Sequence, residues 1–308
     1  MIWLYYLNYA ILAAFLSLFI VELGMAVSAL AYYGKCRERI RHYVMPLWEI
    51  TGTFAVFYMM SLVATYPNLI PAVAPLYIAP VAAAALLVVI RNLFLACSEI
   101  MGEHRMERLA FRVYSVSTIA IGFVLASILG SVVTGSGVGI ATGSISILPM
   151  LFNGFGVSLF FVMLLLGLFA ASALLRDEEG RLLPVAFAVV APVLMVAMMW
   201  AGTVHGMQGI ASNLYLVASW AALLAAVVVL YARGSGAAGK LAIPLIFFGI
   251  MVFAAVQNQL VFNGSASLAS FMTNAAGAEG ILLITTLGGI FLVAALLYFM
   301  RITFLKRA

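Results

Sequence analysis

Three ionisable side chains lie inside long apolar segments of this sequence, where a charge is costly. Glu22 lies in "FIVELGM", Glu49 follows a tryptophan in "MPLWEITG", and Arg91 lies in "VVIRNLF". A charged side chain at the centre of a bilayer costs about 2.5–3.5 kcal/mol on insertion scales, so such residues usually face the interior of a helix bundle. Acids in this setting can take up and release protons, which makes Glu22 and Glu49 candidates for a proton pathway.

Each of these residues also has a purely structural interpretation. Glu22 can be a neutral acid that is hydrogen-bonded to a neighbouring helix, and Glu49 can be a carboxylate paired with Arg37, Arg41 or Arg91. Arg91 can extend to the inner surface, as long cationic side chains do, or it can pair with Glu49 or Glu22. The basic loop is about 20 Å along the helix from Glu22 and about 12 Å from Glu49. We therefore expect Glu49 to be the shallower acid.

Composition identifies the elements that must position these residues. Of the 308 residues, 66% are hydrophobic and 8% are charged, whereas a soluble domain carries about 25% charged residues. The class is an all-α polytopic membrane protein with no soluble domain. Nine apolar runs are long enough to cross a bilayer, and they cover residues 5–33, 44–66, 69–93, 110–133, 148–174, 183–203, 211–232, 241–262 and 280–302.

The basic residues test this map of spans. All 15 Lys and Arg residues fall on one side of the predicted membrane, in the connections 34–43, 91–112, 175–182 and 233–240 and at the C-terminal end. Positively charged loops stay cytoplasmic, so the map predicts an N-terminus outside and a cytoplasmic C-terminus. The net charge of +5 is thereby explained without a nucleic-acid partner. Among the connections on the predicted outer side of the membrane, 134–146 is predicted to be a flexible Gly/Ser segment.

Several kinds of chemistry lack their residues in this sequence. Cys36 and Cys97 have no CxxC partner, and His42, His104 and His205 all lie in predicted loops. Haem held within a bundle needs axial ligands that project into it. The sequence also shows no P-loop, metal cluster or nucleophile triad. We therefore expect no catalytic residue, no metal site and no cofactor bound by this chain alone.

One stretch resembles a known family. The segment "MPLWEITGTFAVFYMMSLVATYPNLIP" is similar to the second-helix region of subunit II of cytochrome bd quinol oxidases, with its Pro-x-Trp-(Asp/Glu) pattern and a later aromatic-Pro turn. Pro46, Trp48, Glu49 and Pro67 match, and Arg91 occupies the place of the arginine that ends the family's next helix. "LFNGFGVSLFF" and "FMTNAAGAEGILLI" resemble two further segments of the family, in the same order.

The chain also departs from this family, as a divergent member would. After the acid it continues Ile50, Thr51, Gly52 in place of the family's Gly-Asn, and "VELGMAV" keeps only the outline of the family's first-helix motif. A non-redox membrane scaffold and a secondary transporter are the alternative functions.

The resemblance implies a fold, a function and partners. It implies one integral membrane domain over 1–308, with a first four-helix bundle in 1–135 and a second bundle plus a peripheral helix in 147–308. The chain would be the haem-free subunit of a quinol oxidase in a prokaryotic plasma membrane, beside a haem-bearing subunit I that holds haem b and haem d. Further expected partners are quinol, lipid, a small single-helix subunit and a quinone at the periphery. Glu49 and Glu22 would carry protons, supported by Trp48 and Arg91.

Overall fold

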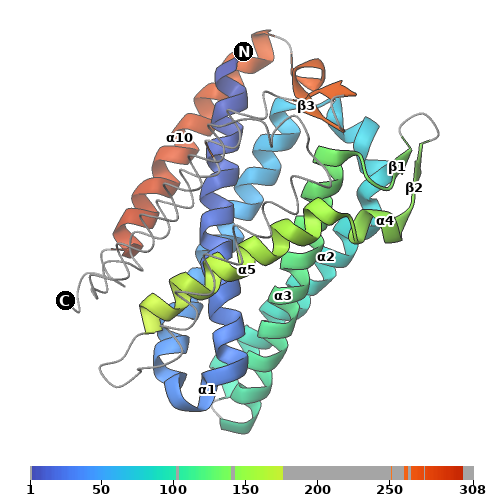
Figure 1. Ribbon diagram of the computed structural model, residues 1–308. Coiled ribbons are helices and arrows are strands. Elements are labelled where there is room, and N and C mark those ends of the chain that lie inside the picture. The colour runs from blue at the N-terminus through green and yellow to red at the C-terminus, as the bar shows by residue number, and fades with distance from the viewer. Residues whose placement is uncertain are drawn as a thin grey trace.

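The computed structural model of the chain describes residues 2–101, 104–139, 143–175, 251, 260–262, 265–273 and 275–300. The long helices are α1 (Ile2–Thr65), α2 (Leu69–Met101), α3 (His104–Thr134), α5 (Gly154–Leu175) and α10 (Ala275–Met300) (Figure 1). The short elements are α4 (Ile147–Leu151), the 3-10 helix η1 (Leu268–Phe271), and the strands β1 (Val138–Gly139), β2 (Ser144–Ile145), β3 (Leu260–Val261) and β4 (Ala266–Ser267).

The described part of the chain contains five helical segments that are long and apolar enough to cross a membrane. They are Trp3–Gly34, Cys36–Thr65, Leu69–Ser98, Met106–Thr134 and Ile147–Leu168. They confirm the first five predicted spans, and α10 contains the predicted last span as far as Met300. The predicted spans 183–203 and 211–232 and most of 241–262 lie outside the described residues. The count of nine helices therefore stays a prediction.

The first two spans are joined by a sharp kink. Cys36 has φ −123° and ψ 24°, which divides α1 into two helices that run in opposite directions. The expected basic loop at 34–43 is therefore wrong, because the residues on either side of Cys36 are helical. Glu22 lies 14 residues before the kink and Glu49 lies 13 after it, which is about 20 Å for each. Glu22 and Glu49 therefore lie at the same height along the two antiparallel helices, which we call level below. The expectation that Glu49 is shallower was also wrong.

In the described parts of the connection 134–146, residues 134–139 and 143–146, the chain forms turns and two short strands in place of the expected flexible Gly/Ser segment. Val138 pairs with Ile145 and Gly139 with Ser144 in an antiparallel hairpin. Gly137 has a φ of +77°, and a Cβ added there would lie 2.6 Å from the backbone nitrogen of Met150. Glycine is required at this position, because other residues disfavour that φ and no room exists for a side chain. The glycines that suggested flexibility thus permit a tight turn instead.

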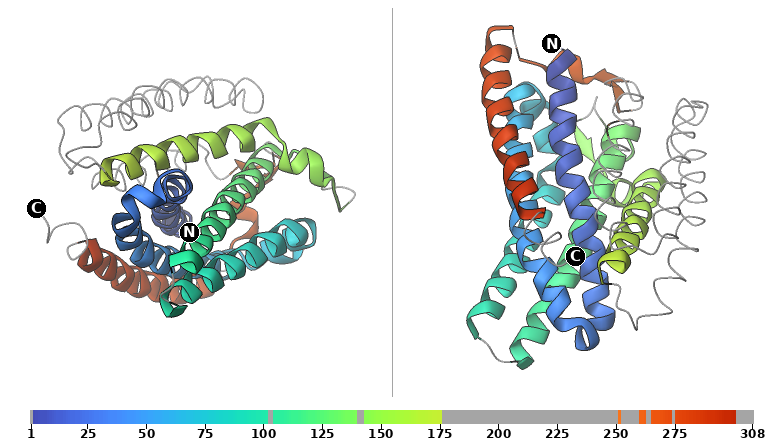
Figure 2. Two further views of the ribbon diagram at one scale, coloured as in Figure 1. Left: turned by 90° about the horizontal axis from the view of Figure 1, so that it is seen from below. Right: turned by 90° about the vertical axis from the view of Figure 1, so that its left-hand side faces the viewer.

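The first half of α1 is the central element of the described part. The most apolar 18-residue window of Trp3–Gly34 is 83% buried, whereas that of Cys36–Thr65 is 22% buried. Both α3 and α5 pack against α1, and α2 packs against α3. Figure 2 shows α5 and α10 on opposite sides of α1. Residues placed on the first half of α1, including Glu22, are therefore enclosed by other helices.

Small residues set the distance between α5 and its neighbours. A Cβ added at Gly24 would lie 1.9 Å from the carbonyl oxygen of Gly167, and one added at Gly130 would lie 2.5 Å from the Cα of Gly156. Backbones approach this closely only where a side chain is lacking, as is common at membrane helix contacts. Asn153 caps α5 beside the second contact, because Gly156 N–H donates to its Oδ1 at 2.5 Å.

We predict that Gly24→Ala lowers the stability of the protein. The added methyl group overlaps the backbone of α5, and overpacking of this kind typically costs about 1–3 kcal/mol. The measurement is the thermal unfolding midpoint of the purified protein in detergent. Gly52→Ala is the matched control, because a Cβ at Gly52 of the same helix meets nothing within 4 Å. Equal midpoints for the two variants would contradict the close approach of α1 and α5.

Candidate functional site: a buried acid and its partners

Glu22 lies at the centre of the candidate site and is fully buried, with 0% of its side chain exposed. Arg91 Nη1 of α2 donates to Glu22 Oε1 at 2.9 Å, and the Tyr114 hydroxyl of α3 donates to the same oxygen at 3.2 Å. One carboxylate therefore joins side chains from α1, α2 and α3.

Arg91 lies in the protein interior, with 4% of its side chain exposed. Its Nε donates to the Oδ1 of Asn92 at 3.1 Å, while Nη1 reaches Glu22. Of the two interpretations of Arg91, the buried charge pair is therefore confirmed, with Glu22 as the partner. Extension to the inner surface, which the position of Arg91 near a helix end favoured, was wrong because an acid is within reach across the α1–α2 contact.

Glu49 has different surroundings from Glu22, although the two are level. Its side chain is exposed, whereas that of its neighbour Trp48 is half-buried and packs against a core around Met25 and Tyr114. Two of the three arginines proposed as its partners bind other acids, because Arg91 pairs with Glu22 and Arg37 with Glu107. Glu49 thus lies on the outer face of the described helices, at the height of the buried acid.

Three buried side-chain polar atoms of α1 and α3 make no hydrogen bond within the described residues. They are Glu22 Oε2, Thr118 Oγ1 and the Trp48 indole Nε1. Buried polar groups of this kind are usually satisfied by internal water, which makes about three hydrogen bonds in such places. The carboxylate oxygen that faces away from Arg91 is therefore available to water or to a proton.

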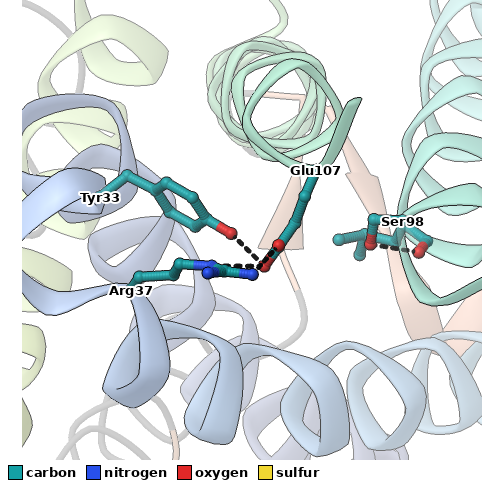
Figure 3. Close-up of polar contacts among 5 residues, drawn as sticks. Tyr33, Arg37, Ser98 and Glu107 are labelled. Carbon is teal, nitrogen blue, oxygen red and sulfur yellow. Dashed lines mark hydrogen bonds and ion pairs between the residues drawn. The ribbon is translucent and has the colours of Figure 1, made fainter. Parts of the chain in front are cut away.

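A second polar cluster lies at the end of the bundle where α1 is kinked (Figure 3). Glu107 of α3 accepts from the Tyr33 hydroxyl at 2.5 Å and from Arg37 Nε at 3.1 Å, and it forms an ion pair with Arg37 Nη2. The Glu107 side chain is 4% exposed and that of Arg37 is 34% exposed. This cluster joins the start of α3 to the turn between the first two spans.

Sequence reasoning missed Glu107 because it lay in a predicted loop, between the basic residues Arg105 and Arg108. One signal was present, since Glu107 falls in the first turn of α3. Acids are favoured there by the partial positive charge of a helix N-terminus. The spacing of Glu107, Phe111, Tyr114 and Thr118 is 4, 3 and 4 residues, which places them on one face of the helix.

The described residues offer no site for a metal or haem. They contain no group of three or more His, Cys, Asp or Glu side chains able to hold a metal ion, and His42 is exposed. The space beside Glu22 is filled by Arg91 and Tyr114. The expectation that this chain binds no cofactor of its own stays a prediction for the chain as a whole.

Comparison with known proteins finds similarity in three-dimensional structure but not in sequence. No protein-family model matches the chain, and no curated protein sequence matches it. In structure, the chain is similar to a chain of the bd oxidase from Geobacillus thermodenitrificans, with a TM-score of 0.74 over 97% of both chains and 16% sequence identity. The two chains therefore share their fold across nearly their whole lengths.

We predict that Arg91→Met destabilises the protein more than the double change Glu22→Gln with Arg91→Met. Removing one partner leaves an uncompensated buried charge, which typically costs about 3–5 kcal/mol, whereas replacing both leaves none. The measurement is the thermal unfolding midpoint in detergent. Glu49→Gln, at the same height on an exposed face, serves as the control and should change the midpoint little. A single variant as stable as the double variant would show that the pair is not held as ions.

Proposed function

We propose that this chain is the haem-free subunit II of a bd-type quinol:oxygen oxidoreductase in a prokaryotic plasma membrane. The observation that carries the proposal is the shared fold with a bd oxidase chain over 97% of both chains. The resemblance of the segment around Trp48 and Glu49 to subunit II supports the same assignment independently. The apolar helices of the described part agree with a multi-pass protein with the N-terminus outside and the C-terminus in the cytoplasm.

The proposed role of the chain is to support a haem-bearing subunit I and to deliver protons to it. In that partner, haem b and haem d would supply electron transfer from quinol and the reduction of oxygen. Oxygen reduction consumes protons at a buried centre, and a proton crosses an apolar medium only through titratable groups and water. Glu22 and Glu49 are the residues of this chain that we assign to that task.

The geometry suggests a separate part for each acid. Glu22 is enclosed, with one oxygen bound by Arg91 and Tyr114 and the other available to water. Glu49 is level with it and exposed, so its carboxylate faces whatever packs against this side of α1. A partner subunit on that face would place Glu49 at the contact, where it could pass protons onward. Trp48 lies next to Glu49 and packs toward the core around Tyr114.

One observation favours a structural scaffold as the second candidate. The Glu22–Arg91 pair joins α1 and α2, and an ion pair of this kind can hold helices together without moving protons. A secondary transporter would predict helices interrupted near mid-span. In the described part, the interruption of α1 lies instead between two spans, at Cys36. The scaffold is therefore the alternative that experiments need to separate.

We predict that the chain, purified from its native membrane through an affinity tag, brings with it a haem-bearing membrane protein. Haem absorbs visible light strongly, so the reduced-minus-oxidised spectrum of the preparation would contain the bands of b-type and d-type haems. The control is the same purification from cells that lack the tag. A preparation without any haem spectrum would contradict the assignment to a bd-type oxidase.

We predict that Glu49→Gln slows quinol-dependent oxygen consumption while leaving the haem content of the complex unchanged. The amide has nearly the same shape as the carboxyl group but cannot exchange a proton, and the loss of a proton-transferring group typically costs about 10²–10⁴-fold in rate. The rate is measured per haem, so that incomplete assembly does not imitate a slow enzyme. Unchanged turnover in a fully assembled complex would instead favour the scaffold.

A further inference from the structure

Glu107 is a second buried carboxylate to which neither the resemblance nor the proposed function gives a role. Its side chain is 4% exposed, and its partners Tyr33 and Arg37 come from the region of the α1 kink. One of them, Arg37, is 34% exposed, so the cluster extends from the protein interior to the inner surface. Figure 3 shows the Tyr33 hydroxyl and the Arg37 guanidinium both directed at this carboxylate.

Glu107 and Glu22 belong to the same seam between α1 and α3. On α3, Phe111 and Tyr114 follow Glu107 on one face, and Tyr114 ends the series by donating to Glu22. The ring of Phe111 lies 4.7 Å from that of Tyr33 and 6.1 Å from that of Tyr114, measured between centroids. A single aromatic layer therefore separates the polar cluster at the inner end from the one around Glu22.

We propose that the cluster of Glu107, Arg37 and Tyr33 is the inner entrance through which protons reach Glu22 along the α1–α3 seam. This inference rests on the proposed function. It names the residue at which protons would enter the chain, a role that Glu49 does not fill. Because the Cys36 kink makes Glu49 level with Glu22, Glu49 is no longer the acid nearer to the inner surface. Glu107, which bonds to residues within three positions of that kink, takes that place.

Each step of this route moves one proton and no electrons. A hydronium ion at the inner surface gives a proton to the Glu107 carboxylate and becomes neutral water, so that one O–H bond forms as another breaks, while Arg37 stays cationic. From Glu107 the proton passes through water and the Tyr114 hydroxyl to Glu22. Glu22 then releases one proton toward the partner subunit for each one that it receives, so its charge is restored in every cycle.

The Phe111 layer determines how the proton crosses the seam. Seven residues of α3 separate Glu107 from Tyr114, which is about 10 Å of helix, whereas a single O–H···O contact spans about 2.7–2.8 Å. A few water molecules must therefore enter beside the ring for each transfer. The unsatisfied Oε2 of Glu22 and Oγ1 of Thr118 provide polar groups that can hold such water on the far side of the ring.

The test uses the complete complex, carrying Glu107→Gln, Glu107→Asp or the control Glu38→Gln in this chain. Glu38 is exposed and lies next to Arg37, so its variant removes a nearby charge without touching the seam. The reduced complex is mixed rapidly with oxygen, and proton uptake from the bulk solution is followed with a pH-indicator dye, per haem. We expect Glu107→Gln to take up protons at least about tenfold more slowly, Glu107→Asp to recover part of the rate, and Glu38→Gln to match the unaltered complex.

The outcomes separate this inference from the proposed function. If the unaltered chain brings no haem-bearing partner, the proposed function fails and the route fails with it. If the complex forms but Glu107→Gln and Glu38→Gln take up protons equally fast, the Glu107 cluster is only a structural contact and the inference alone is overturned. Should Glu107→Gln fail to assemble, Tyr114→Phe keeps both acids and removes the hydroxyl through which the route reaches Glu22. Slower uptake in that variant supports the route, and an unchanged rate overturns it.

Discussion

The buried ion pair of Glu22 and Arg91 constrains the rest of the described structure. An ion pair in an apolar interior is tolerated only when its geometry is good, so the side chains of Arg91 on α2 and Tyr114 on α3 must both reach Glu22 at this height. Gly24, two residues further along α1, brings the backbone of α5 into contact and closes another side. With these sides occupied by packed helices, access to Glu22 is directed along the helix seams. The position of the acid and the route to it thus follow from the same contacts.

The kink at Cys36 has a second consequence for this arrangement. By replacing a loop with a sharp turn, it makes two acids on opposite arms of one helical hairpin level with each other, one enclosed and one exposed. It also brings Arg37 to the start of α3, where the positive end of the helix favours the Glu107 carboxylate. A single local feature therefore determines the relative height of Glu22 and Glu49 and the composition of the inner cluster.

The sequence predicted the elements of this fold better than their contacts. Hydrophobic run length located the first five spans because each must cover the same thickness of bilayer. The sequence left open whether Arg91 pairs with Glu22 or Glu49. That choice depends on which helices are neighbours, and the length of an apolar run does not show this. The kink was missed because charged residues at 35–41 resemble a loop, although long charged side chains are compatible with helix. Glu107 was missed for the same reason.

Energetics distinguish the two roles considered for the buried charges. Replacing a buried ion pair with well-packed apolar residues is often neutral or stabilising by about 1–4 kcal/mol, so helix association alone does not call for ions at Glu22 and Arg91. The close contacts of Gly24 with Gly167 and of Gly130 with Gly156 already hold the helices together by packing. What apolar residues cannot supply is a group that binds and releases protons. The buried ion pair is therefore the costly feature of this bundle, and helix association alone does not require it.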